Sequence, residues 1–204
     1  MKHTLLFDTG PEEAAWERNA ARLKADVGAI ERIHLSHWHR DHSGGLIQAI
    51  KLINGAKSAD QKNVAVDLHP DRPEYRGMMT PMGVPLSLEA DPSFADIETA
   101  GGLVEKSSES HTVLDDMFLV SGEIPRETVY ELGITGGIRY TQNTGKWTKD
   151  ELIADERLVM CNLKGKGLVV FTGCSHAGVI NVCKHALNLG APIWRGWWIS
   201  SGRQ

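Results

Sequence analysis

The chain has only three cysteines, no long apolar run and no block of like charge. Cys161, Cys174 and Cys183 form an odd number without zinc-knuckle spacing, so we expect reduced, partly buried thiols and no disulfide framework. No stretch has the uninterrupted apolar length that a bilayer crossing demands, and the N-terminus turns polar too early for a signal peptide. These absences indicate a cytoplasmic protein with no membrane partner.

The charges are nearly balanced and scattered along the chain. Lys and Arg number 22 and Asp and Glu number 26, giving a net charge of −4. Nucleic-acid binding would call for a basic track, so a nucleic-acid partner is not expected. A length of 204 residues with 41% apolar content predicts one domain, over residues 1–204, with a sizeable core.

Short apolar runs alternate with helical spacings along the chain. The pattern predicts strands at residues 4–7, 30–35, 64–68, 118–120, 158–163 and 168–171, the last two as a hairpin. It predicts helices at residues 12–25, 46–53 and 179–189, the last closed by Gly190. Residues 71–110 are rich in Pro, Gly, Met and Ser and are predicted as loops with at most short elements. The mixture indicates a layered α/β architecture.

Three imidazoles and a carboxylate follow the strand predicted at residues 30–35. His37 and His39 can point toward one ion from an extended turn, while Asp41 and His42 can address a second ion. The alternatives are a solvent-facing cluster of histidines, or a core histidine such as His34 bonded to backbone groups. The spacing of the cluster and the Gly pair that follows it favour a metal site.

Several segments resemble one enzyme superfamily. Residues 35–46, LSHWHRDHSGGL, resemble the HxHxDH signature of the metallo-β-lactamase superfamily, and residues 7–10, FDTG, resemble its upstream aspartate motif. Residues 122–126, GEIPR, and 172–178, TGCSHAG, are similar to the subgroup named for 7,8-dihydropterin-6-methyl-4-(β-D-ribofuranosyl)-aminobenzene-5′-phosphate synthase. The resemblance implies the α/β class and the superfamily's αββα four-layer sandwich.

The resemblance also implies residue roles. It assigns the first ion to His37, His39 and His176, and the second ion to Asp41 and His42. Zinc is the implied metal, as one ion or two, although the same ligands accept iron or manganese. Asp41 would position the zinc-bound hydroxide or accept its proton. Asp8 would accept a hydrogen bond from a liganding imidazole, unless it is only a turn-forming aspartate.

The implied activity is that of a hydrolase or group transferase acting on a small phosphorylated or heterocyclic substrate. Glu123 and Arg126 are candidates for substrate contact, because a guanidinium suits phosphate or carboxylate, although Arg126 could equally be a surface residue after a Pro turn. Cys174 is interpreted as a small side chain beside the metal rather than as a nucleophile. His69 and His111 have no assigned role.

The chain departs from the subgroup at both ends. It begins almost on FDTG, and where members continue with GGFHL and a later His, it has Trp198 at the place of the first His. Indole cannot replace imidazole as a ligand, so we expect an incomplete sandwich and a weak second ion. Exposed Trp194, Trp197 and Trp198 favour association into a homo-oligomer.

Two alternatives to the implied hydrolase or group transferase stay open. One is a thioesterase or phosphodiesterase of another branch of the superfamily, and the other is a degenerate metal-binding module without catalysis.

Overall fold

The computed structural model describes residues 3–193. Four parallel strands form a first sheet in the order β1-β2-β3-β6, and helices connect them. The strands of the first sheet are β1 (Leu5–Phe7), β2 (Arg32–His34), β3 (Ala65–Leu68) and β6 (Leu103–Lys106). The connecting helices are α1 (Glu13–Leu23), the 3₁₀ turn η1 (Val27–Ala29), α2 (Arg40–Ser43), α3 (Leu46–Ala56) and α4 (Phe94–Thr99).

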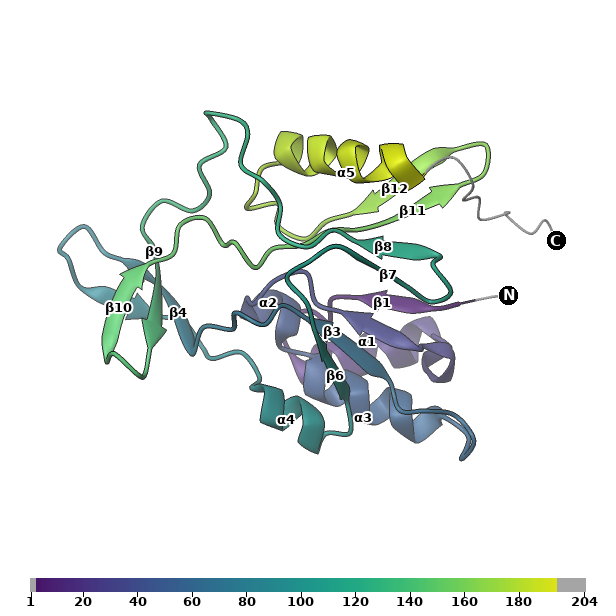
Figure 1. Cartoon of the computed structure of the whole chain (residues 1–204). Coiled ribbons are helices and arrows are strands. Elements are labelled where there is room, and N and C mark those ends of the chain that lie inside the picture. The colour runs from purple at the N-terminus through teal and green to yellow at the C-terminus, as the bar shows by residue number, and fades with distance from the viewer. Residues whose placement is uncertain (1–2, 194–204) are drawn as a thin grey trace.

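A second sheet is antiparallel, in the order β12-β11-β8-β7, and is followed by the last helix. Its strands are β7 (His111–Val113), β8 (Phe118–Val120), β11 (Val159–Leu163) and β12 (Gly167–Phe171), and the helix that follows is α5 (Val179–Ile193). Figure 1 shows α5 above this sheet and α1, α3 and α4 below the first sheet. The layers therefore run helix, sheet, sheet, helix.

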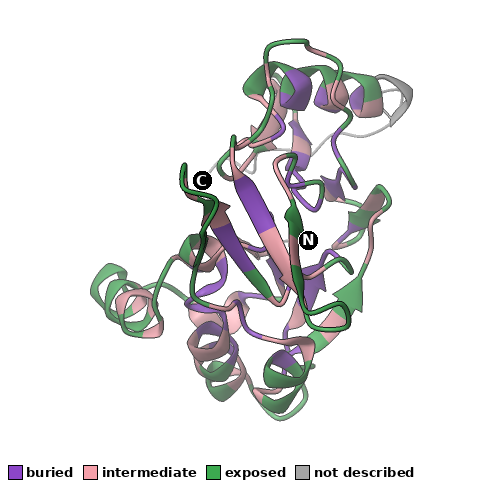
Figure 2. Cartoon of the chain, turned by 90° about the vertical axis from the view of Figure 1, so that its left-hand side faces the viewer, coloured by how far each residue is buried: buried purple, intermediate pink, exposed green. Residues whose placement is uncertain are grey.

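Each of the three interfaces between these layers has its own apolar cluster. Alternate strand residues such as Ile33 and Val66 pack against α3 and α4. Leu158 and Met160 of the second sheet's hairpin region pack against α5. Val120 and Val159, together with half-buried Phe7, lie between the two sheets. Figure 2 shows the buried residues running along the central strands. The αββα architecture predicted from the sequence is confirmed.

A third sheet stands at one end of the sandwich (Figure 1). Its order is β10-β9-β4-β5, and its members are β4 (Tyr75–Met79), β5 (Pro85–Ser87), β9 (Gly137–Thr141) and β10 (Lys146–Lys149). Pairing of β4 with β9 joins segments about sixty residues apart in the chain, including Gly77 with Ile138. Residues 71–110, predicted as loops with at most short elements, contain β4, β5, α4 and β6, so the prediction understated how far these short elements pair. α5 also continues past Gly190, which was predicted to close it.

Polar side chains form a network between the two main sheets. Asp67 is buried, and its carboxylate pairs with Arg157 Nη1 at 2.8 Å and with His111 Nε2 at 2.8 Å. The guanidinium of Arg157 also donates to the carbonyls of Leu35 and Asp67, both at 3.1 Å. His34 beside it is fully buried, and within residues 3–193 neither ring nitrogen has a hydrogen-bond partner. The alternative of a backbone-bonded His34 is therefore wrong.

The structure tests the predictions on the cysteines and on membrane-spanning helices, but not the prediction on the tryptophans near the C-terminus. Cys161, Cys174 and Cys183 are free thiols, as predicted, but Cys174 and Cys183 are exposed rather than partly buried. Among residues 3–193, no helix has both the length and the apolar character needed to cross a bilayer. Trp194, Trp197 and Trp198, on which the oligomer prediction rests, lie outside the described residues.

Candidate metal centre

The histidine segment follows β2 at the carboxyl end of the first sheet. The backbone bends at His37 and Trp38, where the N–H of His39 donates to the His37 carbonyl at 3.0 Å. The Trp38 indole is fully buried, donates through Nε1 to the His69 carbonyl at 3.0 Å and meets Phe94 edge-on. The rings of His37 and His39 meet edge-on, with their centroids 4.7 Å apart. Their Nε2 and Nδ1 atoms, respectively, lie 2.9 Å apart.

Two glycines let the neighbouring loop approach the histidine segment. A Cβ at Gly44 would lie 1.8 Å from the Pro11 carbonyl oxygen, and one at Gly45 would lie 2.3 Å from that of Thr9. A hydrogen bond also joins the two segments, because the backbone N–H of Thr9 donates to the His42 carbonyl at 2.8 Å. The Gly pair after the HxHxDH segment is thus a requirement of close backbone packing.

The second histidine turn follows β12. Gly173 sits where a Cβ would be 2.6 Å from Ser36 Oγ, so this turn passes close to the end of β2. It brings His176 Nε2 to 3.2 Å from His39 Nδ1, and the ring centroids of His37 and His176 to 4.9 Å. One ring nitrogen from each of His37, His39 and His176 lies within 4.8 Å of the others. The structure therefore brings the three predicted ligands of the first ion together.

The three imidazoles are in the form that binds metals. Burial, together with the charges of neighbouring His39 and His42, holds the pKa of His37 well below its ordinary value. Burial and the nearby Arg76 guanidinium lower the pKa of His39 to about 3 and that of His176 to about 4. Neutral imidazole nitrogen is a ligand of zinc, so this donor set fits a divalent ion.

Asp8 and His42 lie beside this group. Asp8 follows β1 in a left-handed conformation with φ of 58°, and its Oδ2 accepts a hydrogen bond from His42 Nδ1 at 2.7 Å. Its Oδ1 accepts from the backbone N–H of Ser36 at 2.7 Å. Burial alone would lower the pKa of His42, but the Asp8 hydrogen bond and the charges of Asp8 and Asp41 raise it. Asp8 thereby fixes the ring so that His42 Nε2 is free to face the cluster.

Asp41 and Cys174 complete the ring of polar groups. The carboxylate of Asp41 is exposed, with Oδ2 at 3.5 Å from His42 Nε2. The thiol of Cys174 lies 3.0 Å from the same nitrogen. Burial, with the charges of Asp41, Glu156 and Asp8, raises the pKa of the Cys174 thiol.

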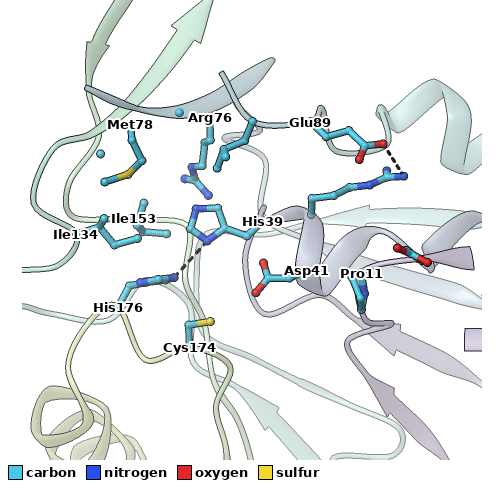
Figure 3. Close-up of a pocket in the computed structure, with 15 residues that line it drawn as sticks. Pro11, His39, Asp41, Arg76, Met78, Glu89, Ile134, Ile153, Cys174 and His176 are labelled. Carbon is cyan, nitrogen blue, oxygen red and sulfur yellow. Dashed lines mark hydrogen bonds and ion pairs between the residues drawn. The ribbon is translucent and has the colours of Figure 1, made fainter. Parts of the chain in front are cut away.

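A cavity of about 530 Å³ opens over His39 and His176. Figure 3 shows these rings, with Asp41 and Cys174, on one side and the third sheet on the other. Met78, Leu88, Ile134 and Ile153 supply apolar lining, while Arg40 and Arg76 line it with cationic groups. The volume is within the range of small-molecule sites.

Residues of the segment before β11 hold both histidine turns, a feature that no motif in the sequence predicts. The buried Asp155 carboxylate accepts from the Trp38 backbone N–H at 2.7 Å and pairs with Arg76. The buried Glu156 carboxylate accepts from the N–H groups of His176 and Ala177, at 2.9 and 2.6 Å. Two adjacent carboxylates thus fix the two turns from which the imidazoles come.

Arg126 and Glu123 do not line this cavity. Arg126 Nη1 donates to the His176 carbonyl at 2.5 Å, and its Nη2 donates to the carbonyls of Leu152 and Ile153. Glu123 is exposed, with Oε1 3.2 Å from His69 Nε2. The guanidinium is engaged by backbone behind His176, which gives Arg126 a positioning role. Contact of either residue with substrate stays a prediction.

Comparison with known proteins agrees with this geometry. No family model matches the chain. An uncharacterized protein of Methanocaldococcus jannaschii is 32% identical over 91% of this chain and 63% of the relative. From the same organism, 7,8-dihydropterin-6-methyl-4-(β-D-ribofuranosyl)-aminobenzene-5′-phosphate synthase is 27% identical over 93% of this chain and 61% of the relative.

A solved structure supports the same fold. The crystal structure of a metal-dependent hydrolase of the β-lactamase superfamily matches with a TM-score of 0.66 at 21% identity, over 90% of this chain and 60% of that chain. The chain thus spans about three-fifths of the length of the relatives it matches. The chain has the metallo-β-lactamase fold, and the predicted resemblance to this superfamily and to the aminobenzene-phosphate synthase is confirmed.

Proposed function

We propose that the chain is a metal-dependent hydrolase or group transferase, with His37, His39 and His176 as ligands of the first ion. The observation that carries the proposal is the convergence of these three neutral imidazoles beside a cavity of about 530 Å³. Zinc fits the donors, and iron or manganese would be accepted by the same set. A divalent ion bound there supplies Lewis-acid activation of water and of the electrophile.

The chain's own residues support the acid–base part of this chemistry. Asp41 lines the cavity with an exposed carboxylate, which can orient a water molecule and accept its proton. Asp8 holds His42 through Nδ1, and Glu156 and Arg126 hold the turn of His176 from behind. Ligands fixed in this way need no rearrangement when an ion binds, which favours both affinity and catalysis.

The cavity supports a small substrate with both apolar and anionic parts. Met78, Ile134 and Ile153 offer an apolar wall for a ring. Arg40 lines the same cavity, paired with the exposed Glu89 at 3.1 Å, and can exchange that partner for a phosphate or carboxylate. The name of the synthase relative contains a pterin ring and a phosphate. We therefore propose a phosphorylated or heterocyclic substrate.

The test is metal content together with metal-dependent turnover. The purified chain, dialysed against zinc and then against buffer, is expected to retain at least one ion, measured by atomic emission. Turnover of generic phosphodiester and thioester substrates is expected to disappear after chelation and to return with zinc. A chain that retains no ion, or turnover that survives complete chelation, would refute the proposal. Retained metal without turnover on any substrate would favour the binding module without catalysis.

Replacement of Glu156 by Gln is expected to weaken binding of the first ion by about 10–100-fold. The reason is that Glu156 accepts two backbone N–H groups in the turn of His176, whereas Gln offers one oxygen and turns an NH₂ group toward the other donor. Zinc affinity is measured by competition with a chromophoric chelator. Glu127→Gln is the matched control, because Glu127 is exposed and its partner Lys184 is 3.5 Å away. Equal affinities of the two variants would show that Glu156 does not position His176.

A further inference from the structure

The thiol of Cys174 occupies a place that the proposed function leaves unused. Cys174 lies two residues before His176 in the turn after β12, and Figure 3 shows its sulfur between His176 and Asp41. Its Sγ is 3.0 Å from His42 Nε2. One ligand atom from each of His37, His42 and Cys174 lies within 4.8 Å of the others, so these residues form a second group that overlaps the first at His37.

The orientation of His42 directs this group toward an ion. Asp8 Oδ2 accepts the hydrogen bond of His42 Nδ1 at 2.7 Å, which leaves Nε2 as the metal-binding atom. Nε2 faces two anionic or ionisable groups, the carboxylate of Asp41 at 3.5 Å and the thiol of Cys174 at 3.0 Å. Nitrogen, oxygen and sulfur from three side chains are a set that zinc accepts.

We propose that Cys174 is a ligand of a second metal ion, together with His42 and Asp41; this inference rests on the proposed function. On binding, the S–H bond breaks, the sulfur donates its electron pair to the ion, and the proton leaves to solvent without any change of oxidation state. Cys174 replaces the histidine ligand in whose place the sequence has Trp198. The chain therefore binds two ions tightly, where a weak second ion was expected from the sequence. A thiolate in the set also disfavours magnesium and calcium.

Cobalt is the probe, because Co²⁺ takes zinc sites and a thiolate bound to it gives a charge-transfer band in the near ultraviolet. Titration of the reduced 204-residue chain with Co²⁺ is expected to give this band with the second equivalent. Cys174→Ser is expected to lose the band, to keep the first ion and to bind the second at least about 10–100-fold more weakly. Cys174→Asp, which offers a carboxylate, is expected to retain two ions without the band.

The other two thiols provide matched controls. Cys161→Ser and Cys183→Ser are expected to keep the band, because Cys161 is in β11 and Cys183 in α5, and neither belongs to the group of His37, His42 and Cys174. Two bound cobalt ions without the band, or a band that survives Cys174→Ser, would overturn the assignment of Cys174 while leaving the first site intact. Absence of any cobalt binding would remove both the assignment and the proposed function. Circular dichroism of each variant checks that it is folded.

Discussion

Replacing His39 by Ala is expected to lower affinity for the first ion by more than about 100-fold, beyond the loss expected for a residue that only supports a ligand. His39 Nδ1 is the shared neighbour of the other two nitrogens, 2.9 Å from His37 Nε2 and 3.2 Å from His176 Nε2. Two imidazoles remain in the variant, which is too few for a tightly held ion. At a free zinc concentration ten times the wild-type dissociation constant, mass action would load the first site in roughly one tenth of the variant molecules.

The measurement is zinc-dependent thermal stability together with turnover. Zinc is expected to raise the Tm of the wild type and to raise that of His39→Ala by less, because an ion that binds the folded state stabilises it and the variant loses the first site only. The turnover of His39→Ala is expected to fall in proportion to the fraction of molecules that hold the first ion. His185→Ala serves as control, since His185 lies on α5 and its Nε2 bonds to the Ser121 carbonyl at 3.2 Å. A His39→Ala variant that binds zinc like His185→Ala would remove the first site from the proposal.

Features with a local signal were predictable from the sequence. The apolar run of β8 and the hairpin of β11 and β12 appear as predicted, because period and turn residues are local properties. The convergence of His176 with His37 was predicted only through the resemblance of the motifs. In the structure it depends on the turn after β12 passing the end of β2, at Gly173 and Ser36.

Features that depend on distant pairing were not predictable. Arg76 and Asp155 are 79 residues apart in the chain, and only the folded protein brings them together at Trp38. Glu156 has no motif of its own, and its role appears only from its contacts with the turn of His176. The strands of the third sheet lack alternation strong enough to predict, since β10 has no fully buried residue. α5 passes Gly190 because packing of Leu189 and Ala186 outweighs the cost of about 1 kcal/mol for a helical glycine.

The same residues link stability to the candidate site. Arg157 follows Asp155 and Glu156 directly, and its backbone N–H donates to the Ser36 carbonyl at 2.8 Å. Three consecutive residues therefore contact the histidine segment, the turn of His176 and the network between the sheets. Because the imidazoles are positioned by this buried segment, loss of the network is expected to loosen the metal site as well as the core.

Replacing Arg157 by Met is expected to lower the free energy of unfolding by about 3–5 kcal/mol. Both partners are buried, with side chains 0% and 1% exposed, so removing the guanidinium leaves Asp67 with too little compensation for its burial. Arg32 at 3.0 Å and His111 remain as partial partners. A domain is stable by only about 5–15 kcal/mol, so urea unfolding should show a large drop in the midpoint. Arg139→Met, which removes a pair with the exposed Asp71, is the control and should cost about 1 kcal/mol or less.

The pH dependence of the stability lost in Arg157→Met shows whether the loss comes from the charge of Asp67 or from side-chain packing. Burial alone would raise the pKa of Asp67, but the His111 hydrogen bond and the charges of His34 and Arg157 hold it below its ordinary value. The stabilisation from this carboxylate is therefore present above about pH 4 and is lost as the pH falls further. The difference in stability between wild type and Arg157→Met should be full at pH 6 and shrink toward pH 3. A difference that stays constant over this range would assign the loss to the missing side-chain volume instead.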